Sequence, residues 1–160
     1  MKPCLHRIVI FPDFEEAFRS IINAHLGHGA TSFYPTISSS PFEKLHQAAQ
    51  VCEQLMAEPD SPVLGLHIEG PYLNKKMAGE QFADQVKEID GQEYRELVES
   101  TRCIRRWDAS PELPGALEFA SYLREKGILA AVSHTEAEYD GIRAAYEAGF
   151  THAAHLHLGI

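Results

Sequence analysis

The chain alternates between short apolar runs and longer segments in which apolar residues recur every three or four positions. The longer segments predict helices, because a helix brings such positions onto one face. The short runs are rich in β-branched residues and predict strands buried on both sides. The predicted helices span residues 13–26, 40–56, 92–100, 113–126 and 136–148. The predicted strands span residues 30–36, 63–68, 101–108, 128–133 and 151–156.

This regular alternation predicts an α/β fold in which helices cover a parallel sheet. Residues 72–90 show no clear period, and we interpret them as an extended surface loop. No linker or composition change divides the chain, so we expect residues 1–160 to form a single domain.

Composition narrows the class of partner. The chain has 23 acidic and 14 basic residues, and its net charge of −9 argues against nucleic-acid binding. No apolar run approaches the roughly 20 residues that cross a membrane, so no membrane partner is expected. Residues 1–12 lack the apolar core of a secretory signal, which predicts a cytoplasmic protein.

Potential metal-binding side chains follow three of the predicted strands. Glu69 follows the strand at 63–68, His134 follows the strand at 128–133, and histidines 152, 155 and 157 lie in or after the last strand. The carboxyl ends of parallel strands meet at one edge of a sheet. One carboxylate and two imidazoles there suit Zn²⁺ and leave a coordination position for water. An ordinary interpretation stays open for each residue: a turn at Glu69, packing at His134, and solvated side chains near the end.

One segment resembles a known family. Residues 63–76, VLGLHIEGPYLNKK, resemble the LGLHLEGPFLN-KK signature of the N-acetylglucosamine-6-phosphate deacetylases, in the amidohydrolase superfamily. Other blocks are similar to that family's motifs and occur in the same order: GATSFYPT at 29–36, SPE at 110–112, AVSHTEA at 131–137 and EAGFTHAAHL at 147–156. The resemblance covers about residues 15–156.

The resemblance implies a (β/α)₈ TIM barrel, which typically takes about 250 residues. The chain is therefore expected to be a central, truncated fragment with about five of the eight βα units. The family forms homodimers and hydrolyses the N-acetyl group of N-acetylglucosamine 6-phosphate, giving glucosamine 6-phosphate and acetate in amino-sugar catabolism.

The same resemblance assigns the site residues. It implies one divalent metal ion held by Glu69, His134 and His155, with zinc expected and iron, cobalt or manganese as alternatives. We interpret His67, which precedes Glu69 by two residues, as a residue behind the ligands rather than a ligand.

The chain also departs from the family pattern. Where the family has a substrate-contacting histidine, this chain reads Met77–Gln81, so Gly79, Glu80 and Gln81 are the substrate-binding candidates. The family's catalytic aspartate corresponds to a position beyond residue 160, and nothing in the sequence supports Asp108 as its replacement. We therefore expect this chain to be inactive alone. Two alternatives stay open: another amidohydrolase activity, or a non-catalytic remnant that binds metal.

Overall fold

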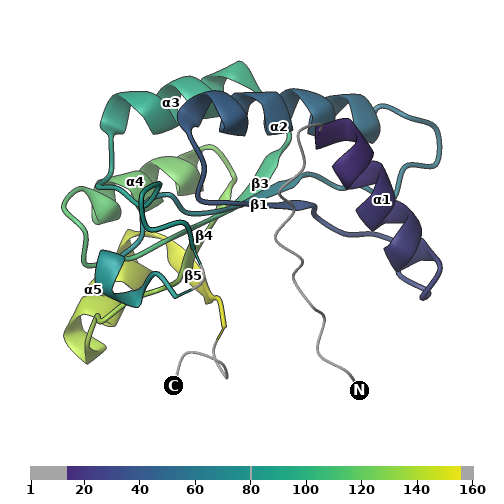
Figure 1. Ribbon diagram of the computed structural model, residues 1–160. Coiled ribbons are helices and arrows are strands. Elements are labelled where there is room, and N and C mark those ends of the chain that lie inside the picture. The colour runs from purple at the N-terminus through teal and green to yellow at the C-terminus, as the bar shows by residue number, and fades with distance from the viewer. Residues whose placement is uncertain (1–13, 80, 156–160) are drawn as a thin grey trace.

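The computed structural model describes residues 14–79 and 81–155, which form a curved parallel sheet with helices outside it (Figure 1). The sheet has five strands in the order β1-β2-β3-β4-β5, and each strand runs parallel to its neighbour. The strands are β1 (Thr36–Ser38), β2 (Leu66–Glu69), β3 (Ile104–Ala109), β4 (Leu129–Val132) and β5 (Phe150–Ala153). The predicted α/β class and parallel sheet are confirmed.

A helix precedes or follows each strand on the outer side of the sheet. The helices are α1 (Phe14–Leu26), α2 (Phe42–Met56), α3 (Gly91–Ser100), α4 (Ala116–Glu125) and α5 (Tyr139–Ala148), with a short 3₁₀ helix η1 (Lys75–Met77) after β2. Strands paired in chain order, with helices outside, form an arc of a (β/α)₈ barrel. Among the described residues, no helix is long and apolar enough to cross a membrane.

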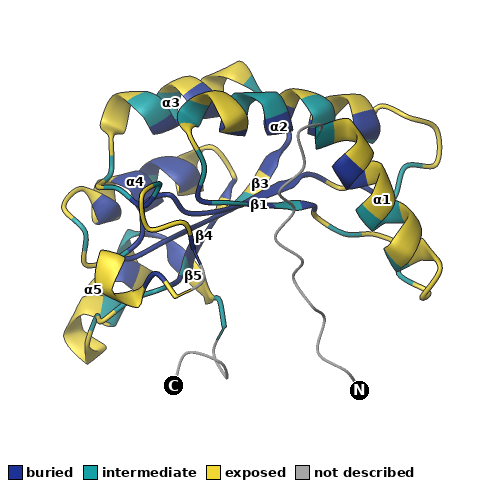
Figure 2. Cartoon of the chain, viewed as in Figure 1, coloured by how far each residue is buried: buried dark blue, intermediate teal, exposed yellow. Residues whose placement is uncertain are grey.

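The hydrophobic core lies between the sheet and the helices, whose buried faces point toward the strands (Figure 2). Trp107 of β3 is fully buried, stacks on Tyr72 at 5.8 Å between ring centroids and meets the ring of Phe119 edge-on. Its indole Nε1 donates to the Gly70 carbonyl oxygen at 2.7 Å. Trp107 thereby fixes the start of the loop that follows β2 against the neighbouring strand.

The first two strands begin later than predicted. Phe33 and Val63, both in predicted strands, form an isolated bridge. Regular pairing starts at Thr36 and Leu66. Pro35 has no N–H to donate, although its carbonyl accepts from the His67 N–H at 3.0 Å. The predicted boundaries were wrong by several residues, and Glu69 is the last residue of β2 rather than part of a turn.

Residues 72–90 form a loop as predicted, interrupted by η1, but part of this loop is buried rather than exposed at the surface. Leu73, Ala78 and Val86 form a small buried cluster of their own, and the side chain of Gln81 is buried as well. The backbone N–H of Lys87 returns to the Pro71 carbonyl at 2.9 Å. These buried residues are too irregularly spaced to produce a helical or strand period, so the pattern did not reveal a packed loop.

Candidate metal centre

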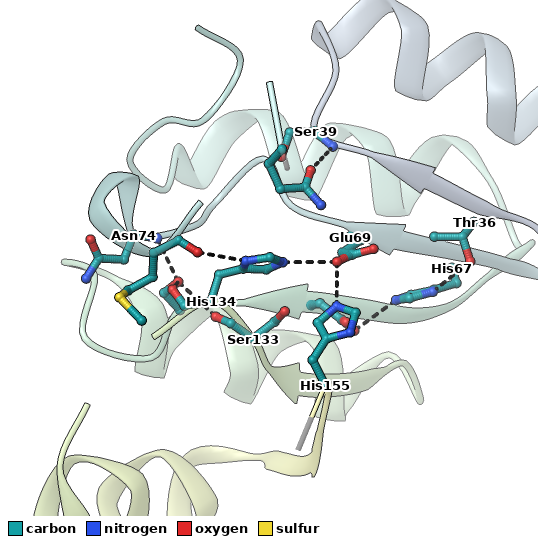
Figure 3. A network of polar contacts seen from close by, with 12 residues as sticks. Thr36, Ser39, His67, Glu69, Asn74, Ser133, His134 and His155 are labelled. Atoms are coloured by element: carbon teal, nitrogen blue, oxygen red, sulfur yellow. Dashed lines mark hydrogen bonds and ion pairs between the residues drawn. The ribbon is translucent and has the colours of Figure 1, made fainter. Parts of the chain in front are cut away.

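Three side chains from three different strands meet at the carboxyl end of the sheet (Figure 3). Glu69 ends β2, whereas His134 and His155 each lie two residues beyond β4 and β5. The Oε1 atom of Glu69 lies 3.0 Å from His134 Nε2 and 2.7 Å from His155 Nε2. One ligand atom from each residue lies within 4.8 Å of the others, and this is the one such group found within residues 14–79 and 81–155.

The chemistry of this donor set fits a divalent metal ion. A carboxylate with two imidazoles is a set that zinc binds in catalytic sites, where a further coordination position holds water. Both imidazoles point their Nε2 atoms at the same carboxylate oxygen. An ion that all three side chains contact would therefore need little movement of their backbones.

The electrostatics favour an ionised carboxylate. Burial raises the pKa of Glu69, but hydrogen bonds from His134 and His155 outweigh it and lower the pKa to about 2. The hydrogen bond to Glu69 in turn raises the pKa of His134. Glu69 is thus deprotonated at neutral pH, which metal binding requires, whereas His134 must lose a proton before its Nε2 can bind an ion.

The loop after β2 orients the ring of His134. Its Nδ1 lies 2.9 Å from the carbonyl oxygen of Met77, the last residue of η1. Since a carbonyl oxygen accepts only, Nδ1 carries a proton and Nε2 is the nitrogen directed at Glu69. Holding the second ring nitrogen in this way fixes the tautomer that a metal-binding histidine needs.

Both histidines have left-handed backbone conformations. Their φ angles are +48° at His134 and +52° at His155, and Asp60 is the other non-glycine residue with positive φ in the described part of the chain. Such a conformation costs about 1–3 kcal/mol and is often found at functional sites. Here it occurs two residues beyond the ends of β4 and β5.

His67 lies beside the ligand group but is bound elsewhere. Its Nδ1 is 3.0 Å from Thr36 Oγ1, and its Nε2 is 3.0 Å from Asp108 Oδ1. The carboxylate of Asp108 is fully buried and accepts two hydrogen bonds from Arg106, at 2.7 and 2.8 Å. Sequence reasoning missed this ion pair. The signal was the Arg-x-Asp spacing, which places both side chains on one face of β3.

A buried hydroxyl adds a polar group to the inner face of the sheet. Ala131 pairs with Asp108 in the sheet register, so Ser133, two residues further on, follows it on the same face. The Oγ of Ser133 is buried and has no hydrogen-bond partner. A buried hydroxyl without a partner is costly, so Ser133 adds an unsatisfied polar group next to the ligand His134 in the sequence.

Of the remaining candidate residues from the sequence, only some lie near the Glu69–His134–His155 group. A Cβ placed on Gly79 would lie 3.9 Å from His134 Cε1, so Gly79 adjoins a ligand ring. Gln81 Oε1 accepts from the Ser39 N–H at 3.0 Å, just beyond the end of β1. Glu80 and His157 lie outside the described residues. His152 is exposed and contacts Thr151 rather than the ligand group.

These features define a class: an arc of a (β/α)₈ barrel with a candidate metal centre at the carboxyl ends of its strands. No family model matches the chain. Curated relatives do match, and the chain is similar over most of its length to N-acetylglucosamine-6-phosphate deacetylases, the family that its motifs resemble.

The similarity extends over most of this chain but only part of each relative. N-acetylglucosamine-6-phosphate deacetylase from Haemophilus influenzae is 30% identical over 142 residues, which cover 89% of this chain and 37% of that protein. N-acetylgalactosamine-6-phosphate deacetylase from Escherichia coli O157:H7 is 28% identical over 137 residues, 82% of this chain and 36% of that protein. The chain thus spans little more than a third of the length of these relatives.

Solved structures agree with this similarity. The crystal structure of N-acetylglucosamine-6-phosphate deacetylase from Pasteurella multocida superposes with a TM-score of 0.84 at 28% identity, covering 91% of this chain and 38% of that one. An aspartate-to-alanine variant of the Mycobacterium smegmatis enzyme, in complex with N-acetyl-D-glucosamine-6-phosphate, gives the same TM-score and identity over 92% of this chain and 40% of that one. The predicted partial barrel is confirmed.

Proposed function

We propose that this chain carries the metal centre of a deacetylase that hydrolyses the N-acetyl group of N-acetylglucosamine 6-phosphate, releasing acetate. The observation that carries the proposal is the convergence of Glu69, His134 and His155 on one point. Deacetylases of phosphorylated amino sugars among the relatives supply the substrate class.

Glu69, His134 and His155 would hold one divalent ion, with zinc as the expected metal. Such an ion, when bound, lowers the pKa of a bound water and polarises the amide carbonyl. This chain's own residues prepare the site: Glu69 stays ionised, and the Met77 carbonyl keeps the proton of His134 on Nδ1.

Moving a proton from water to the leaving amine needs a further acid–base group. Asp108 is poorly suited, because its buried carboxylate is already bound by Arg106 and His67. The family resemblance implies that an aspartate outside these residues does this work. We therefore propose that the chain binds metal but, on its own, releases no acetate at an enzymatic rate. We also propose that the complete protein is a cytoplasmic homodimer.

Metal binding is tested by equilibrium dialysis of the 160-residue chain against Zn²⁺. We expect one ion per wild-type chain and little retained by Glu69→Ala or His134→Ala. Unchanged Zn²⁺ uptake in both variants would overturn the ligand assignment.

The activity is tested in a chimera in which residues 15–156 replace the matching segment of the Haemophilus influenzae relative. We expect acetate release from N-acetylglucosamine 6-phosphate, and its loss when Glu69→Ala is added. N-acetylgalactosamine 6-phosphate is assayed in parallel, because a relative acts on that epimer. A folded, metal-loaded chimera that releases acetate from neither sugar would favour the non-catalytic alternative.

A further inference from the structure

The hydroxyl of Ser110 joins three loops beneath the candidate metal centre. Ser110 directly follows β3, is fully buried, and places its hydroxyl hydrogen between the carbonyl oxygens of Ser133 at 3.0 Å and His134 at 2.7 Å. The same oxygen accepts from the backbone N–H of Asn74 at 2.7 Å. A single hydroxyl thus contacts both the backbone of a proposed ligand and the loop that follows β2.

Glu112 and Asn74 complete this connection nearer the surface. The Glu112 carboxylate accepts from the Glu136 backbone N–H at 2.9 Å, from the Thr135 hydroxyl and from Asn74 Nδ2 at 2.8 Å. Asn74 Oδ1 also accepts from the Lys76 N–H at the start of η1. We call Asn74, Ser110 and Glu112 the loop brace.

The loop brace acts on the part of His134 that most needs support. The backbone of His134 has the left-handed φ of +48°, which a non-glycine residue keeps only when its surroundings hold it there. Ser110 binds the carbonyl of this residue, and Glu112 binds the residues that follow it. The carbonyl that orients its ring belongs to Met77, three residues after Asn74 on the same loop. The backbone and the ring of His134 therefore depend on one connected set of hydrogen bonds.

We propose that Ser110 is a positioning residue for the metal centre: its hydroxyl holds the turn at His134 and the Asn74–Met77 loop in the one relative placement that directs His134 Nε2 at Glu69. This inference rests on the proposed metal site but not on deacetylase activity. Partners that orient metal ligands typically change metal affinity by about 10–100-fold when they are removed.

The test compares Ser110→Ala with Ser121→Ala in the 160-residue chain. Ser121 is a matched control, because its hydroxyl also donates to a backbone carbonyl, that of Ala148 at 3.0 Å, across the α4–α5 contact. Three properties are measured: the Zn²⁺ dissociation constant by calorimetry, the visible absorption spectrum of the Co²⁺-loaded chain, and the thermal midpoint of the metal-free chain.

We expect both substitutions to lower the metal-free midpoint, and Ser110→Ala to lower it more, since the buried Ser110 hydroxyl contacts two carbonyls and one N–H whereas that of Ser121 contacts one carbonyl. Ser110→Ala alone should weaken Zn²⁺ binding by about tenfold and alter the Co²⁺ spectrum, which reports ligand geometry. Equal metal affinities and equal Co²⁺ spectra in the two variants would overturn the positioning role.

The outcomes also separate the two proposals. If the wild-type chain binds metal and Ser110→Ala weakens it, the positioning role stands even when the chimera releases no acetate. If the chimera is active while Ser110→Ala binds metal as tightly as Ser121→Ala, the function stands and the positioning role falls. A wild-type chain that binds neither Zn²⁺ nor Co²⁺ would overturn both.

Discussion

The imidazole of His134 bridges the Met77 carbonyl and the Glu69 carboxylate, with 2.9 Å on its Nδ1 side and 3.0 Å on its Nε2 side. The first contact comes from a loop and the second from the end of a strand. Because the same ring serves both, the stability of the chain, its protonation and metal binding are linked at this residue.

Zn²⁺ should stabilise the chain through this group. At a free Zn²⁺ concentration 100-fold above the dissociation constant, binding to the folded state alone adds about 2.7 kcal/mol to the free energy of unfolding. Glu69→Gln should abolish most of this gain, because it removes the only anionic ligand of the three. Urea unfolding with Zn²⁺ or with a chelator measures the difference. Glu118→Gln is the control, since Glu118 is exposed on α4, pairs with Arg95 of α3 and is not one of the proposed ligands; an equal Zn²⁺ effect in the two variants would contradict the assignment.

The metal-free chain should be most stable at mildly acidic pH. The pKa of Glu69 is lowered from 4.5 to about 2 on folding, so its contribution is present above pH 4.5 and is lost as the pH falls toward 2. The pKa of His134 is raised above 6.5, so its contribution is complete below pH 6.5 and is lost as the pH rises through the raised value. Both contributions come from the Glu69–His134 ion pair, which therefore adds most to the free energy of unfolding between about pH 4.5 and 6.5.

Urea midpoints measured with a chelator from pH 3 to 9 test this profile. In Glu69→Gln, the urea midpoint should fall less at both the acidic and the alkaline end of this profile. The reason is that the neutral glutamine no longer forms an ion pair with His134. A variant whose midpoint falls as much as that of the wild type at both ends would show that other groups cause the fall. In the wild type with Zn²⁺, affinity should instead rise with pH, since His134 must release a proton to bind the ion.

The Arg106–Asp108 pair should respond unequally to loss of each partner. Asp108 is fully buried, whereas the side chain of Arg106 is 28% exposed and can turn toward water. Arg106→Met, which leaves the buried carboxylate with His67 alone beside it, should cost about 3–5 kcal/mol. Asp108→Asn should cost about 1–2 kcal/mol. Urea unfolding of both variants and of the double variant measures the asymmetry, and the reverse order would refute it.

Gly65 should tolerate no side chain. A Cβ there would lie 2.2 Å from Arg105 Cγ and 2.6 Å from the Cys103 carbonyl oxygen, which belongs to backbone and cannot move aside freely. Gly65→Ala should therefore destabilise the fold by about 2 kcal/mol or more.

Gly141 of α5 can accept a side chain, because a Cβ there would lie 3.5 Å from Ala137 Cβ, an ordinary contact. Gly141→Ala should therefore raise the free energy of unfolding by about 0.5–1 kcal/mol through helix propensity. Thermal unfolding of both variants gives the two signs.

The fold class could be predicted because each helix and strand carries its own hydrophobic period. The strand boundaries could not. An apolar run such as residues 63–68 looks uniform in sequence, but strand pairing depends on which N–H and carbonyl groups face a neighbouring strand. Regular pairing begins only after Pro35 in β1 and after Gly65 in β2. The packing of the loop at 72–90 was missed because its buried residues, Leu73, Ala78 and Val86, are too irregularly spaced to show a period.

Two rules, that parallel strands end at one edge and that these residue types bind metal, indicated Glu69, His134 and a histidine near the last strand. The choice of His155 came from the family resemblance, and the structure brings it to the other two residues. The supporting contacts did not follow. The sequence does not predict that Ser110 binds the His134 carbonyl, since that contact depends on the backbone path after β3 and after β4. The pairing of Asp108 with Arg106 was also missed, although their spacing indicated a shared face of β3.

The Glu69–His155 contact joins residues 86 positions apart, and the Glu69–His134 contact joins residues 65 apart. A metal ion bound there would act as a cross-link that closes loops of this length. Closing such loops removes several kcal/mol of chain entropy from the unfolded state, by the same reasoning that applies to a disulfide. The ion would thus tie β5, an edge strand that pairs only with β4 among the described strands, to β2 near the opposite edge of the sheet. Its removal should loosen α5 and β5 before the rest of the chain unfolds.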